Sequence, residues 1–273
     1  WMYSMVDMAI YPVLFNEYLA FFVPGLGSGA RYAVSLAVIW TAVAVNLRGA
    51  LDVGRVSVGV GVLVLAAFGA MAVGALPNQV AEPFVPFVKP GSHALEGLGV
   101  GLSIAIWNYI GWDNASTVQG EVVDASRTYP RALAFALPLV TLGYFGALLP
   151  ALGATDWTTW TDGAWPAIAS AAVGGGAFGN VLSAVLCLAA LASALALFNA
   201  LLMSYSRIPL AMASDGLLPR PLARLDPRGT PRNAILASAV VYSACALLDF
   251  EHLVVADVLL YALAVFLEFA ALL

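Results

Sequence analysis

The side chains best suited to binding chemistry lie inside an apolar stretch, residues 95–118. There the run 108–117 reads Asn-Tyr-Ile-Gly-Trp-Asp-Asn-Ala-Ser-Thr, which brings amide, hydroxyl and carboxylate groups into apolar surroundings. Backbone can leave the helical conformation within a membrane only where it lines a protein or water cavity. Discontinuous helices of this kind hold substrate and coupling ions in secondary transporters. We therefore predict a broken, substrate-binding helix; the alternative is an ordinary helix whose polar face packs inward.

Asp113 lies in the middle of this polar run. A charged side chain at the centre of a membrane span costs about 2.5–3.5 kcal/mol on insertion scales, so it normally faces an interior partner. No Lys or Arg falls within any span predicted below. Asp113 is therefore either protonated or paired with a ligand, an ion or a residue outside this chain, and an amine-bearing substrate would fit.

Two further apolar stretches carry acidic and aromatic residues at 4-3-4 spacing, which places them on one helical face. The first set is Asp7, Tyr11, Leu14 and Tyr18, and the second is Asp257, Tyr261, Ala264 and Glu268. Each face could line a cavity, form hydrogen bonds between helices, or bring a carboxylate to the membrane interface. Asp7 and Glu268 are candidates for coupling or gating.

The elements that must position these residues are membrane-spanning helices. The 273 residues are 62% hydrophobic and 10% charged, whereas soluble domains have about 45–50% apolar and about 25% charged residues. The formal net charge of −5 and the pI of about 4.8 also argue against a nucleic-acid-binding domain. Composition therefore predicts an all-α polytopic membrane protein whose partners include the lipid bilayer and no nucleic acid.

Eight stretches are long and apolar enough to be spans of about 20 residues. They are residues 1–23, 32–47, 57–76, 95–118, 132–154, 181–206, 233–248 and 253–273. If the spans alternate in direction, one set of loops holds nine arginines and the other holds only Arg31 and Lys89. The excess of basic residues marks the cytoplasmic side, so the first span starts there. The loop 156–179 then faces outward, with Trp157, Trp160 and Trp165 as interfacial aromatic residues.

Signals for a cofactor or an enzyme are missing from the sequence. Both cysteines lie in apolar stretches without metal-ligand spacing, and both histidines fall in predicted loops. No phosphate-binding glycine loop occurs. We therefore expect no cofactor, no metal and no enzymatic activity. Because the chain starts at Trp1 and ends inside an apolar run, we also expect it to be a single transmembrane transporter domain, residues 1–273, truncated at both ends.

Four segments resemble the amino acid–polyamine–organocation (APC) permease superfamily. Residues 107–122, WNYIGWDNASTVQGEV, are similar to the family's broken sixth helix and the Glu after it, here Glu121. The segment SRIPLAMASDGLLP at 206–219 is similar to the cytoplasmic signature after the eighth helix, and RGTP at 228–231 to the turn before the ninth. The opening VDMAIYPVLFNEYL, 6–19, resembles the third helix of the L-type amino acid and polyamine uptake branch.

The resemblance implies a leucine-transporter-like inverted-repeat fold, of which this chain holds the third to tenth helices. It implies that Trp107 is an aromatic gate and that the backbone at Asn108 and Ile110 faces the substrate amine. Tyr109, Gly111 and Asp113 belong to the same broken helix, and Tyr11 and Tyr261 fall at positions linked to polyamine recognition. Glu121 joins Asp7 and Glu268 as a candidate for coupling or gating. No Lys occurs in 57–76, where one proton-coupled subgroup places its coupling amine.

These observations together predict a secondary active transporter of amino acids or polyamines that works by alternating access. A proton or another cation is the candidate coupling ion, and a plasma-membrane, multi-pass location is expected. The alternatives are an amino acid/amine exchanger, or a transport-inactive nutrient sensor or partner subunit of the same fold.

Overall fold

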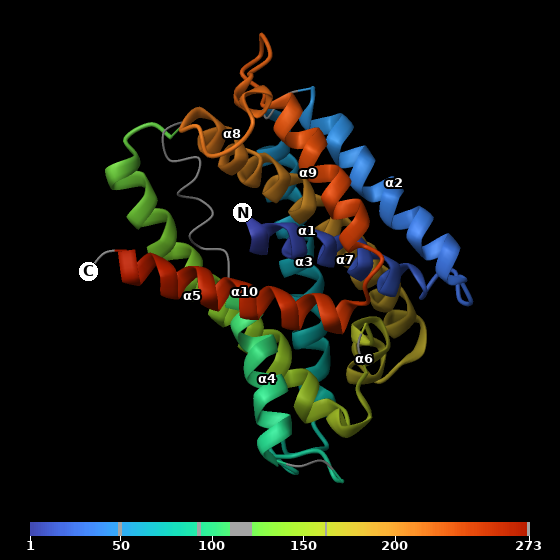
Figure 1. Cartoon of the computed structure of the whole chain (residues 1–273). Helices are drawn as coiled ribbons and strands as arrows, with labels where there is room; N and C mark the ends of the chain where they lie inside the picture. Colours follow the sequence, from blue (N-terminus) through green and yellow to red (C-terminus); the bar gives the residue numbers. More distant parts are fainter. Residues whose placement is uncertain (49–50, 92–93, 110–121, 162, 272–273) are drawn as a thin grey trace.

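The computed structural model describes residues 1–48, 51–91, 94–109, 122–161 and 163–271, and within them the chain forms only helices and connecting loops (Figure 1). The helices are α1 (Met2–Leu19), α2 (Ser28–Asn46), α3 (Leu51–Ala75), α4 (Ala94–Tyr109), α5 (Ala125–Ala154), α6 (Trp165–Ala172), α7 (Gly176–Tyr205), α8 (Arg207–Ser214), α9 (Arg232–Cys245) and α10 (Phe250–Ala271). Short 3-10 helices lie between these helices at Leu76–Asn78, Trp157–Thr159 and Arg220–Ala223.

Five segments of the described chain are long and apolar enough to cross a membrane. They are Ser28–Asn46, Ser57–Asn78, Ala125–Ala154, Gly176–Ser214 and Phe250–Ala271. The other predicted spans coincide with helices that fall short by this measure: α1 contains Asp7 and Glu17, α9 has 14 residues, and α4 is described as far as Tyr109. The helical architecture is therefore confirmed, whereas the count of eight spans and the inverted repeat stay predictions.

α7 is the helix around which the others pack. It contacts α1, α2, α3 and α6. In its most apolar stretch of 18 residues, 44% is buried inside the protein, a larger share than in any other candidate span. In the C-terminal part of α7, Phe198 joins Met8, Ile39 and Tyr242 in a cluster formed with α1, α2 and α9. In its N-terminal part, Leu182 and Leu186 join a second cluster with α3, α5 and α6. α7 thus links two cores that have no buried residue in common.

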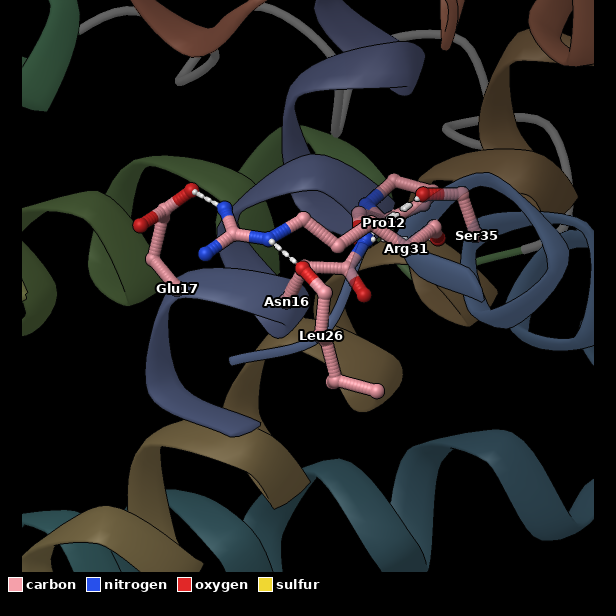
Figure 2. Close-up of polar contacts among 6 residues, drawn as sticks. All are labelled: Pro12, Asn16, Glu17, Leu26, Arg31 and Ser35. Carbon is pink, nitrogen blue, oxygen red and sulfur yellow. Dashed lines mark hydrogen bonds and ion pairs between the residues drawn. The ribbon is translucent and has the colours of Figure 1, made fainter. Parts of the chain in front are cut away.

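A polar contact fixes the end of α1 against α2 (Figure 2). The buried Nδ2 of Asn16 lies 3.2 Å from the Pro12 carbonyl oxygen, 3.0 Å from that of Arg31 and 2.8 Å from Ser35 Oγ. Arg31 also forms an ion pair of 2.8 Å with Glu17 Oε1 and donates a hydrogen bond of 3.3 Å from Nε to the Leu26 carbonyl oxygen. These contacts join the C-terminal end of α1 to the first turns of α2.

Candidate functional site

Asp7 is a buried carboxylate that accepts two hydrogen bonds from tyrosines. Its side chain is 3% exposed. Tyr11, one turn later on α1, donates to Oδ1 over 3.3 Å, and Tyr205, the last residue of α7, donates to Oδ2 over 2.9 Å. The spacing of Asp7 and Tyr11 predicted a shared face, and their hydrogen bond confirms it. Hydroxyl donors stabilise the ionised form of a carboxyl group, so this arrangement favours a negative charge inside the helix bundle.

Asp257 brings a second carboxyl group to the same region from α10. It is fully buried at 0% exposed, and neither of its oxygens has a hydrogen-bond partner among the described residues. Asp7 is close enough to interact with it electrostatically, and α10 packs directly on α1. Two acidic side chains from different helices therefore lie near each other where α10 packs on α1.

A cavity of about 170 Å³ lies on the other side of Tyr11, between α1, α3, α4 and α7. Tyr11 and Trp107, both predicted to bind substrate, line it together, so the structure brings these two residues into one site. Phe68, Trp165 and Leu186 supply part of the apolar wall. Because the Tyr11 hydroxyl also donates to Asp7, a single side chain connects the apolar cavity with the buried carboxylate.

Asn108 and Tyr109, also predicted to bind substrate, contact α5 and are not among the residues that line this cavity. Tyr144 donates a hydrogen bond of 3.1 Å to Asn108 Oδ1, and the hydroxyl oxygens of Tyr109 and Thr141 are 3.4 Å apart. These contacts place the two residues at an α4–α5 interface. The remaining predicted residues of the broken helix, Ile110, Gly111, Asp113 and Glu121, lie outside the described residues.

Tyr261 and Glu268 lie on α10 at different depths. The Tyr261 ring meets the Tyr3 ring edge-on with centroids 5.4 Å apart, and the Tyr3 ring meets that of Tyr205 at 6.0 Å. This row of rings leads from α10 across α1 to the tyrosine that binds Asp7. Glu268 is exposed near the far end of the helix. Tyr261 is thus connected to the Asp7 site through aromatic contacts and does not line the cavity of Tyr11 and Trp107.

A second cavity, of about 290 Å³, lies between the end of α1, the start of α2 and the α9–α10 turn. Asn16, Glu17, Arg31 and Asp249 contribute its polar groups. The backbone N–H of His252 donates to Asp249 over 3.0 Å, and this hydrogen bond lowers the pKa of the Asp249 carboxyl. The cavity therefore combines an ion pair with an exposed carboxylate that stays ionised at neutral pH.

Two residues of the Asp7 site were not among the predicted site residues. Tyr205 is 198 positions from Asp7, so no helical spacing could connect them. Asp257 did carry a signal, because an acidic residue in an apolar span without a basic partner marks a functional position. Among the described residues no group of three His, Cys, Asp or Glu side chains is arranged to hold a metal ion.

Known transporters resemble this chain over nearly its whole length. The probable polyamine transporter At1g31830 of Arabidopsis thaliana is 34% identical over 279 residues, which cover 99% of this chain and 54% of the relative. Polyamine transporter PUT1 of rice, Oryza sativa subsp. japonica, is 34% identical over 281 residues, covering 99% and 50%. The branched-chain amino acid permease BcaP of Lactococcus lactis is 27% identical over 222 residues, covering 80% and 47%.

The chain spans about half the length of these curated relatives. They are named as transporters and permeases, which agrees with the prediction of a carrier in place of an enzyme. A family model described as amino acid permease matches residues 1–273. Together with the apolar helices, this match identifies an integral, multi-pass membrane protein. The chain belongs to the amino acid permease family of the APC superfamily.

Proposed function

We propose that the complete protein is a secondary active transporter of polyamines or amino acids that works by alternating access. The observation that carries this proposal is the cavity lined by Tyr11 and Trp107, with the buried carboxylate of Asp7 behind Tyr11. Aromatic and aliphatic walls suit the carbon chain of a small substrate, and a nearby negative charge favours an ammonium group. The names of the plant relatives point to the same class of substrate.

In this proposal Asp113 of the broken helix, residues 95–118, pairs with the substrate amine. Trp107 closes the cavity above the carbon chain. Alternating access then requires the helices that hold the broken segment to move relative to their neighbours, which is how inverted-repeat carriers expose one central site to each side in turn. We place the protein in the plasma membrane.

Uptake by the purified complete gene product in liposomes tests the proposal. We expect uptake of putrescine, arginine or leucine, and we expect Trp107→Ala to weaken it by about fivefold or more, since loss of a packed aromatic contact costs upwards of about 1 kcal/mol. Trp40→Ala is the matched control, because Trp40 is 42% exposed on α2. Asp113→Asn should weaken putrescine uptake and spare leucine uptake.

The same measurement separates the alternatives. Transport that occurs only when the liposomes are preloaded with a counter-substrate would identify an exchanger. If no substrate is taken up or exchanged, the carrier proposal is wrong and a sensor or partner subunit takes its place. Equal uptake of putrescine by wild type and by Asp113→Asn would refute the role given to Asp113.

A further inference from the structure

Asp257 is a fully buried acidic side chain that the described structure leaves without a partner. Both of its oxygens are shielded from solvent and neither accepts a hydrogen bond from a described residue. Native proteins satisfy nearly all buried polar atoms, and an exception calls for an explanation such as a bound ion or a functional role. An ionised carboxylate would be especially unfavourable here, because burial removes its hydration and nothing replaces it.

Asp7 is in the opposite situation. The two tyrosine hydroxyls that donate to Asp7 occupy one lone pair on each oxygen. Donors directed at a carboxylate favour its ionised form, and a second carboxyl group nearby is then harder to ionise. The structure thus differentiates the two acids: Asp7 is equipped to carry the negative charge, and Asp257 is equipped to be neutral.

The two helices that carry Asp7 and Asp257 supply no basic side chain to neutralise them. Neither α1 nor α10 contains Lys or Arg, and Arg31, at the start of α2, pairs with Glu17 at the end of α1. The ionisable side chains near the pair on α1, α7, α9 and α10 are neutral donors or thiols. They are Tyr3, Tyr11, Tyr205, Tyr242, Cys245 and Tyr261. From α4, the aromatic group next to the α1–α10 contact is Trp107, which does not titrate.

The size of the site restricts the cation that can bind. Apolar side chains of Ala9, Ile10, Leu253 and Val254 pack together beside the two acids. Neither acid lines either cavity described above. Metal ions such as Ca²⁺ take six to eight oxygen ligands, carboxylates prominent among them, and no group of three His, Cys, Asp or Glu side chains is arranged to hold a metal ion among the described residues. A proton needs neither space nor a ligand shell.

We propose that Asp7 and Asp257 together bind a single proton, held on Asp257 and separate from the substrate site at the broken helix. The proton arrives from water, forms an O–H bond with one oxygen of Asp257, and returns to water when that bond breaks. With the proton bound, α10 stays against α1. Without it, two negatively charged carboxylates lie near each other at the contact, and their repulsion favours separation of the helices. This inference rests on the proposed transport function, to which it adds the coupling ion and its place.

Accumulation against a gradient is the first test. The complete gene product is placed in liposomes with the membrane potential held at zero and a gradient of one pH unit. If the wild-type protein carries one proton with each neutral substrate molecule, it should accumulate that substrate about tenfold. A gradient of one pH unit supplies the same free energy as a tenfold concentration ratio requires. Asp257→Asn should equilibrate the substrate without accumulation, yet still exchange it with preloaded substrate. Glu251→Gln, which removes an exposed carboxylate from the same helix, should accumulate as wild type does.

Infrared difference spectroscopy between acidic and alkaline detergent solution is a second test that does not depend on transport. We expect the carbonyl band of a protonated, buried carboxylic acid in wild type and in Glu251→Gln, and its loss in Asp257→Asn. A folded Asp257→Asn protein that keeps the band overturns the proposal, and so does one that still accumulates substrate. Wild type that transports substrate without any response to the pH gradient refutes the coupling and leaves the transport function standing.

Discussion

Asn16 shows how much depends on one amide group within the helix bundle. Its Nδ2 reaches acceptors on α1 and α2 together, and the side chain is 3% exposed. It lies one turn after Pro12, a residue that cannot donate a backbone hydrogen bond. Pro12 thus weakens the helix in the turn before it, and the Asn16 amide fastens the turn after it to α2.

Replacement of Asn16 by alanine should destabilise the protein. The carbonyl oxygen of Arg31 and the buried Ser35 hydroxyl each lose a partner, and such losses cost about 1–3 kcal/mol. The apparent midpoint of thermal unfolding in detergent, followed by tryptophan fluorescence, should fall. Asn180→Ala, at an exposed position of α7, is the control and should leave the midpoint within error. Equal midpoints for the two variants would show that the Asn16 contacts do not contribute.

At this scale the sequence predicts contacts within a helix and misses those between helices. Spacing of four residues was enough to predict that Asp7 and Tyr11 share a face. The hydrogen bond from Tyr205 to Asp7 could not be predicted, because the position of Tyr205 depends on how α7 crosses α1. The placement of Asn108 on Tyr144 of α5 likewise follows from packing between helices, which no periodicity in one segment contains.

At the scale of the elements, the close contact between α6 and α7 depends on a glycine, Gly179. A Cβ atom added at Gly179 of α7 would lie 2.7 Å from Ser170 Oγ and 3.1 Å from the Ser170 carbonyl oxygen. These are atoms of the α6 segment, and its backbone cannot yield as a long side chain would. The small size of residue 179 therefore sets the distance between the two helices.

Gly179→Ala should lower stability by about 1–3 kcal/mol, the usual range for overpacking a core. Gly146→Ala on α5 should do the reverse, by about 0.5–1 kcal/mol, because Ala favours helix and a Cβ there meets nothing within 4 Å. Both changes are read from unfolding midpoints in the same detergent. A Gly179→Ala protein as stable as wild type would mean that α6 adjusts without loss.

Element prediction succeeded where long apolar runs dominate and missed the short helix α6. α3, α5, α7 and α10 coincide with predicted spans because 20 or more apolar residues leave few alternatives in a membrane. α6 was missed: its eight residues lie within the predicted outer loop 156–179. Pro166 near its start was a usable signal, since proline favours the first turn of a helix.

For the whole molecule, the predicted direction of the spans can be tested with single cysteines. The change Ala81→Cys places a thiol in a loop predicted to face outward, and Asp215→Cys places one in a loop predicted to face the cytoplasm; both residues are exposed. In a background without Cys187 and Cys245, a membrane-impermeant thiol reagent should label the first in intact cells and the second only after permeabilisation. Labelling of both from the same side would contradict the predicted number of spans.

The class of the molecule followed from composition, and its family from a few short motifs. A chain with 10% charged residues has too few polar groups to cover a soluble fold, so the membrane environment was the first conclusion that the sequence allowed. The relation between helices was not accessible in the same way. The sequence marks Asp257 as an acid in an apolar span, but its lack of a hydrogen-bond partner among the described residues becomes visible only once the helices are packed.

The length of α7 makes the site sensitive to the bilayer itself. Its 30 residues extend over about 45 Å at 1.5 Å per residue, whereas the hydrocarbon layer is about 30 Å thick. Such a hydrophobic mismatch is relieved by helix tilt or by local thickening of the bilayer. Tyr205 is the last residue of α7, so any change in tilt moves its hydroxyl relative to Asp7. A change in lipid thickness should therefore alter the geometry of the buried Asp7 carboxylate through the tilt of α7.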